Sequence, residues 1–70
     1  MEEIIINGKR VAHEKDVEEG IKYLMFKISD LEAKVFFDQA YKFGFAMFQD
    51  RLRHKFKLSY HDGKYALEKQ

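Results

Sequence analysis

The chain has 70 residues, no cysteine, no proline and a net charge of +1. This length predicts a single domain over residues 1–70, near the lower limit at which one hydrophobic core gives a stable fold. The lack of cysteine excludes disulfides and thiolate metal sites. The acidic start is unlike a signal peptide, and no apolar run approaches the roughly 18–20 residues of a membrane span. We therefore expect a cytoplasmic protein with no membrane partner.

The first predicted element is a β-hairpin over residues 3–11, whose second strand extends toward His13. Asn7 and Gly8 follow three consecutive isoleucines, and these two residue types tolerate the positive φ angles of a two-residue turn. Residues 14–19 are highly charged and are interpreted as a connector.

Residues 21–28 fit either a helix or a strand. The helical interpretation places a set of apolar residues on one face: Val17, Ile21, Leu24, Met25 and Ile28. As a helix, however, the segment would carry Gly20 in its first turn, at a cost of up to about 1 kcal/mol. Tyr23 and Phe26 would also lie off the apolar face. The almost continuous apolar run after Gly20 favours a strand.

A single long helix is predicted over residues 29–53. Ser29 and Glu32 have the spacing of a capping box, in which each side chain accepts a hydrogen bond from the other residue's backbone. The residues that follow keep helical apolar spacing: Ala33, Phe36, Phe37, Ala40, Gly44, Met47, Phe48 and Leu52.

The alternative ends this helix at Phe43, uses Gly44 as a left-handed cap, and makes residues 45–50 a strand. The long helix is favoured because residues 49–55 contain no Gly, Asn or Pro to reverse the chain.

A second hairpin is predicted from residues 55–60 and 64–69, joined by Asp62 and Gly63. The expected fold is therefore α+β: a small antiparallel sheet of four or five strands packed on one long helix, in the order β-β-β-α-β-β. The alternative architecture has two helices flanked by the terminal hairpins.

No residue pattern indicates catalysis. The glycines are too scattered for a phosphate-binding loop, and Ser29 and Ser59 lie outside any nucleophile motif. The three histidines, His13, His54 and His61, match no metal-ligand spacing. We expect a non-enzymatic protein without a metal, a cofactor or a small-molecule substrate.

The aromatic content predicts a protein partner. Seven phenylalanines and four tyrosines are more ring surface than a chain of this length readily buries. On the long helix, four of them would form one stripe suited to self-association or to a larger partner: Phe37, Tyr41, Phe45 and Phe48. The leading hypothesis is a small binding module, acting as a homodimer or as a regulator or inhibitor of another protein.

The alternative hypothesis is an accessory domain that binds nucleic acid through residues 51–57. Residues 1–32 carry eight acids and five Lys/Arg, whereas residues 33–70 carry four acids and eight Lys/Arg. The basic segment contributes Arg51, Arg53, Lys55 and Lys57, close to Phe56. Cations beside aromatic rings are typical of surfaces that bind single-stranded nucleic acid.

Overall fold

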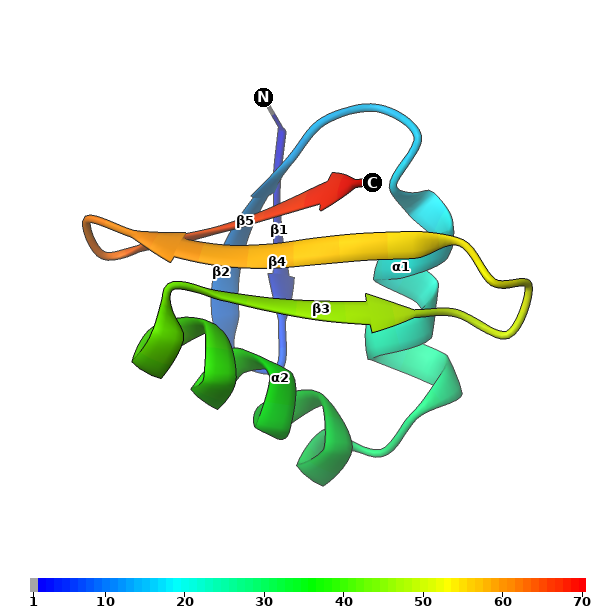
Figure 1. Ribbon diagram of the computed structural model, residues 1–70, viewed down its shortest axis with the longest axis horizontal. Helices are drawn as coiled ribbons and strands as arrows, with labels where there is room; N and C mark the ends of the chain where they lie inside the picture. The colour runs from blue at the N-terminus through cyan, green and yellow to red at the C-terminus, as the bar shows by residue number, and fades with distance from the viewer. Residues whose placement is uncertain (1) are drawn as a thin grey trace.

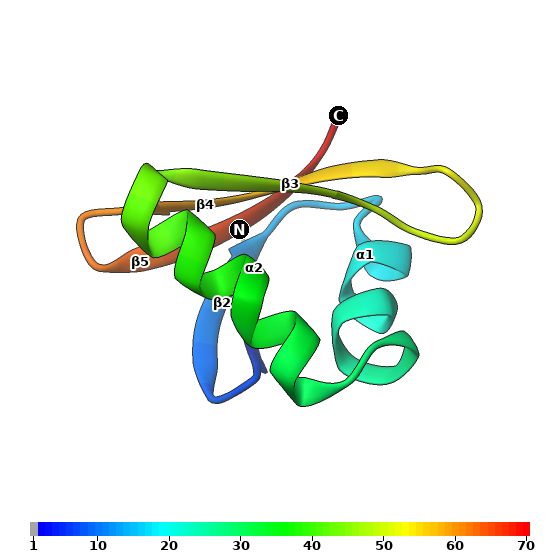
Figure 2. The same ribbon diagram turned by 60° about the horizontal axis from the view of Figure 1, so that its bottom comes forward.

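The computed structural model describes residues 2–70 as an α+β fold with one five-stranded mixed sheet and two helices (Figure 1). Its elements are β1 (Glu2–Ile6), β2 (Lys9–His13), α1 (Glu18–Lys22), η1 (Tyr23–Lys27), α2 (Asp30–Phe43), β3 (Phe45–Gln49), β4 (Lys55–His61) and β5 (Lys64–Lys69). The π-helical turn η1 continues α1 directly. In the sheet the strands lie in the order β1-β2-β5-β4-β3. Both helices lie on one face of the sheet (Figure 2).

Both predicted hairpins are confirmed. Asn7 and Gly8 have φ angles of 54° and 74°, and Asp62 and Gly63 have 52° and 80°. Positive φ at both central residues matches the turn twist to the right-handed twist of the strands. The side-chain nitrogen of Asn7 also donates a hydrogen bond to the backbone oxygen of Asp30, at 2.9 Å, which ties the first turn to the start of α2.

The expectation of a wholly antiparallel sheet is wrong at one pair of strands. β2 and β5 run parallel, with Val11 beside Tyr65 and His13 beside Leu67. This pairing joins the two terminal hairpins into one sheet and leaves β1 and β3 as its edges. No local feature encodes it, because the paired residues lie more than fifty positions apart in the sequence.

The strand predicted over residues 21–28 is wrong, because this segment is helical as α1 and η1. Gly20 is buried, and a Cβ at this position would lie only 2.9 Å from the ring of Phe56. The glycine therefore permits a close helix–sheet contact that offsets its low helix propensity. Tyr23 stacks on Phe48, with ring centroids 5.7 Å apart, whereas Phe26 is left exposed.

The long helix over residues 29–53 is also wrong, although its start is confirmed. Ser29 and Glu32 form the capping box, with both hydrogen bonds at 3.1 Å. The helix ends at Phe43, because Gly44 adopts a left-handed cap with φ of 94°. The alternative in which the helix ends at Phe43 and a strand follows is therefore the observed one. The correct element order is β-β-α-β-β-β.

The turn between β3 and β4 uses an aspartate in place of the glycine, asparagine or proline that sequence reasoning required. Asp50 Oδ1 accepts hydrogen bonds from the backbone N–H of Leu52 and of His54, at 3.0 and 2.8 Å. Arg53 takes a positive φ of 68°. An aspartate that bonds the backbone ahead of it is an Asx turn.

The core lies between the helices and one face of the sheet. Its largest buried side chains come from every layer: Phe37, Phe56, Ile6, Leu24, Leu58, Leu67, Val11 and Val17. The opposite face of the sheet is uncovered (Figure 2). No helix within residues 2–70 combines the length and apolarity needed to cross a membrane.

Candidate functional site

The four residues predicted to bind a partner do not form one stripe. Phe37 and Phe48 belong to the core, with 1% and 6% of their surfaces exposed. Tyr41 is exposed on α2, where its ring lies 4.9 Å from that of Tyr60. Phe45 is exposed on β3. The single stripe is wrong because the helix ends at Phe43, so the predicted spacing does not continue.

The exposed rings of the described chain are Phe26, Tyr41, Phe43 and Phe45. Two of them border β3. Phe43 follows Phe36 by seven residues, so both lie on the same side of α2. Phe36 contacts Phe48 of β3, with ring centroids 5.3 Å apart, which places Phe43 on the β3 side of the helix.

Side chains alternate along β3. Ala46 and Phe48 are buried against the helices, whereas Phe45 and Met47 point to the uncovered face and are 49% and 45% exposed. Together with Phe43, they border the outer side of the sheet's last strand. We name the free side of β3, with these three side chains, the β3 edge surface.

The backbone of β3 alternates in the same way. The N–H of Tyr60 bonds the oxygen of Gly44, and the N–H of Asp50 bonds the oxygen of His54. In an antiparallel ladder, hydrogen-bonded pairs recur at every second residue. The even-numbered residues of β3 therefore face β4. The N–H and C=O groups of Phe45, Met47 and Gln49 point away from the sheet, where the described chain offers no strand to pair with them.

The two edges of the sheet differ in charge. β1 begins with Glu2 and Glu3, and Glu3 lies 3.6 Å from Arg10 across the hairpin. Charged side chains on an edge strand oppose pairing with another chain. β3 has the sequence FAMFQ, with no charge and no proline. Of the two edges, β3 is therefore the unprotected one.

Sequence reasoning identified Phe45 but missed Phe43 and Met47. Met47 would have followed from the alternative that ended the helix at Phe43 with Gly44 as its cap. In that alternative, period-two alternation over residues 45–49 places Phe45 and Met47 on one face.

The four predicted basic residues do not converge on one surface. Lys55 and Lys57 alternate with buried Phe56 and Leu58, so they point to the uncovered face. The ammonium of Lys57 lies 5.4 Å from the ring centre of Phe45. Arg51 and Arg53 instead belong to the β3–β4 turn, and both are exposed.

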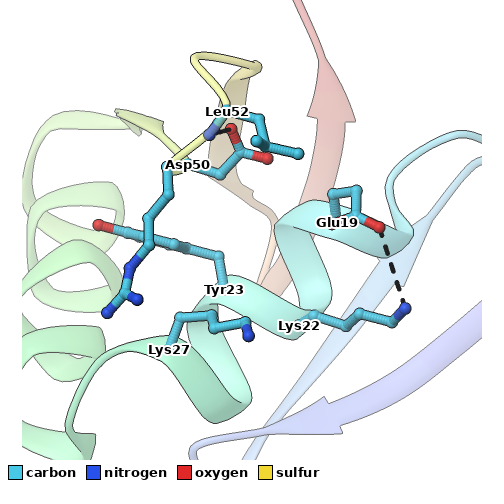
Figure 3. Close-up of a pocket in the computed structure, with 7 residues that line it drawn as sticks. Glu19, Lys22, Tyr23, Lys27, Asp50 and Leu52 are labelled. Carbon is cyan, nitrogen blue, oxygen red and sulfur yellow. Dashed lines mark hydrogen bonds and ion pairs between the residues drawn. The ribbon is translucent and has the colours of Figure 1, made fainter.

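Arg51 does contribute to a small cavity between that turn and the first helix (Figure 3). The cavity measures about 260 Å³ and is lined by Glu19, Lys22, Tyr23, Lys27, Asp50, Arg51 and Leu52. Three cationic side chains thus line the same cavity as one aromatic ring. Glu19 lies 3.9 Å from Lys22, a distance that marks a weak ion pair.

Asp50 is committed to the turn and is not a free acid at this cavity. Its Oδ2 lies 2.9 Å from Nδ1 of His54, and only 6% of its side chain is exposed. Burial acts to raise the pKa of Asp50, but the hydrogen bonds from His54 and Leu52 outweigh it and lower the pKa below its ordinary value.

The remaining titratable feature is Tyr65, in the aromatic group beside Phe37 and Tyr60. Burial, with the charges of Tyr60, Asp38 and Tyr41, raises the pKa of Tyr65 above its ordinary value. Within residues 2–70 no three acidic or histidine side chains gather at a point that could hold a metal ion.

Comparisons with known proteins give no relative: no family model, no curated protein and no solved structure matches the chain. The geometry of the chain itself therefore supplies the basis for a functional proposal.

Proposed function

We propose that this protein is a non-enzymatic binding module that pairs with another polypeptide by strand addition at the β3 edge surface. The observation that carries the proposal is the coincidence of three features on one strand. The backbone groups of Phe45, Met47 and Gln49 face outward, the strand has no charge, and its exposed side chains are apolar.

Strand addition suits this surface because the backbone and the side chains contribute separately. The main-chain groups of an incoming strand supply affinity, and alternate side-chain contacts supply specificity. Phe45 and Met47 would contact one side of the added strand, and Phe43 would contact it from the helix side. An apolar patch without free main-chain groups would not fix the orientation of a partner strand in this way.

The experiment selects extended peptides from a random display library on the immobilised protein, in parallel with the variant Met47→Pro. Proline removes an N–H that faces outward, so the β3–β4 ladder is retained, while its ring blocks an incoming strand. Peptides selected on the unaltered protein should lose at least tenfold in affinity for Met47→Pro.

The matched control is Ile5→Pro on the other edge. The hairpin pairs Ile6 with Lys9, so by the same alternation the N–H of Ile5 also faces outward. Selected peptides should bind this variant like the unaltered protein. Equal loss in both variants, or no loss in Met47→Pro, would contradict strand addition at β3.

A second candidate function, nucleic-acid binding, is favoured by one observation. Lys22, Lys27 and Arg51 line the same cavity as Tyr23 (Figure 3), which combines phosphate-neutralising cations with a ring on which a base could stack. The test is titration with labelled single-stranded DNA and RNA at two salt concentrations, with Arg51→Ala beside the unaltered protein. Absence of binding at low salt would eliminate this function, because phosphate contacts are strongest there.

A further inference from the structure

We infer that the strand added at β3 is the β3 strand of a second copy of this chain, antiparallel to the first and related to it by a two-fold axis at Met47. The inference rests on the proposed function and specifies its partner. Two observations support it: the outward backbone groups of β3 can pair with those of a second β3, and β3 has no charge.

The outward backbone groups have one self-complementary register in which all three of their residues are paired. They belong to Phe45, Met47 and Gln49, which are spaced by two residues. An antiparallel ladder needs that spacing on both strands. Placing Met47 opposite the partner's Met47 sets Phe45 opposite the partner's Gln49, and the reverse. These three pairs give roughly six main-chain hydrogen bonds, two for each pair, and each outward group finds a partner.

Charge favours a second copy at this edge. β3 is neutral, so pairing it with itself places no like charges on adjacent strands. On the neighbouring strand, Lys57 and the partner's Lys57 flank the axis, and two uncharged strands separate them. Three strand spacings are about 14 Å, beyond the Debye length of about 8 Å at physiological salt. The β1 edge, by contrast, carries two carboxylates, those of Glu2 and Glu3.

The same register brings the exposed apolar side chains together. Met47 meets the partner's Met47 at the axis, and Phe45 lies diagonal to it on the uncovered face. Diagonal neighbours across an antiparallel pair are within reach of aromatic side chains. Two surfaces that are each about half exposed, those of Phe45 and Met47, are covered by the same association.

The absence of native cysteine permits a direct test by disulfide trapping. In the inferred register Met47 and the partner's Met47 form a hydrogen-bonded pair with Cα atoms about 5.5 Å apart, which lies in the range that a disulfide spans. Met47→Cys should therefore oxidise to a covalent dimer at micromolar concentration. Phe45→Cys alone should not, because its counterpart lies about 13 Å away along the strand. A mixture of Phe45→Cys and Gln49→Cys should form the mixed disulfide.

Ile5→Cys is the matched control, since Ile5 is an exposed apolar residue on the other edge strand. Amide hydrogen exchange on the unaltered protein gives a measurement without any substitution. The amides of Phe45, Met47 and Gln49 should exchange more slowly as the protein concentration rises. Those of Glu3 and Ile5 should not change.

The inference is overturned if Met47→Cys forms dimers no faster than Ile5→Cys, or if Phe45→Cys alone forms them faster than Met47→Cys. It is also overturned if exchange at β3 is independent of protein concentration. The peptide selection described above has a separate readout. If the protein is monomeric and its selected peptides lose affinity for Met47→Pro, self-pairing is refuted and strand addition is retained. If the selected peptides bind Met47→Pro as tightly as the unaltered protein, the proposed function itself is refuted.

Discussion

Replacing Phe48 or Phe45 with alanine should separate folding from association on a single strand. The two phenylalanines lie three residues apart on β3 and face opposite sides of the sheet. Sequence analysis grouped them in one binding stripe. The structure assigns Phe48 to the core and leaves Phe45 on the surface, so the two variants should fail in different ways.

Phe48→Ala should cost most of the stability of the domain. The ring is 6% exposed and lies 5.7, 5.3 and 5.5 Å, between centroids, from the rings of Tyr23, Phe36 and Phe56. Removing a buried phenylalanine costs about 3–5 kcal/mol, including the cavity that remains. In a chain of this length a single core rarely supplies more than about 3–5 kcal/mol of net stability, so the substitution removes most or all of it. We expect a variant that is largely unfolded at 37 °C.

Phe45→Ala should leave the fold nearly intact. About half of the residue's surface is already in solvent, and the ammonium of Lys57 lies 5.4 Å from the ring centre. A cation–π contact at an exposed site contributes about 0.5–1 kcal/mol, and the strand loses some β propensity. A total cost of about 1 kcal/mol is therefore expected, together with weaker self-association.

Urea denaturation followed by circular dichroism measures the first effect, and sedimentation velocity at several concentrations measures the second. The comparison should be made at low protein concentration, where dissociation does not add to the stability of the unaltered protein. Equal destabilisation by the two substitutions would refute the assignment of opposite faces. A Phe45→Ala variant that associates like the unaltered protein would remove Phe45 from the β3 edge surface.

Three further predictions concern the core and the titratable groups. Gly20→Ala should destabilise the fold by about 1 kcal/mol. A Cβ only 2.9 Å from the Phe56 ring overpacks the core, which costs about 1–3 kcal/mol and outweighs a gain in helix propensity of about 1 kcal/mol. Thermal unfolding measures the net change. The pKa of Asp50 is lowered on folding, so the ionised carboxylate stabilises the fold at pH values above its ordinary pKa of 3.8, and this stabilisation is lost as the pH falls through the pKa of the folded state. Urea titrations from pH 5 to 2 should therefore show a shallower loss of stability in Asp50→Asn. The pKa of Tyr65 is raised, so stability should fall as pH rises beyond 10.0, and less steeply in Tyr65→Phe.

Elements whose signals are local were predictable from the sequence. The two hairpins follow from Asn7-Gly8 and Asp62-Gly63, because a type I′ turn requires positive φ at two successive residues and few residue types tolerate it. The start of α2 follows from Ser29 and Glu32, whose hydrogen bonds span only three residues. In each case the residues that determine the conformation are the residues that adopt it.

The helix over residues 18–27 was not predictable in this way. Gly20 and the apolar run after it favour a strand when considered alone. The helix is stabilised by tertiary contacts that the sequence does not display, namely Gly20 against Phe56 and Tyr23 on Phe48. Both partners lie more than twenty residues away along the chain.

The candidate site was only partly predictable for a related reason. Phe45 was identified because aromatic residues are conspicuous, but its role depends on β3 being a strand and lying at an edge. Gly44 decides the first point through its left-handed conformation. The parallel pairing of β2 with β5 decides the second.

That parallel pairing explains why a neutral strand is left at the edge. Joining β2 to β5 places the two hairpins side by side, so β1 closes one end of the sheet and β3 the other. An uncharged apolar edge is an aggregation hazard that proteins usually block with lysine, proline or a bulge. This chain has thirteen Lys/Arg and twelve Asp/Glu, yet places none of them on β3. The next strand, β4, carries two lysines on its uncovered face, so charged residues lie on the strand beside the edge but not on the edge strand itself. A strand left unprotected beside charged neighbours is expected where its edge is occupied by a partner strand, and this supports pairing through β3.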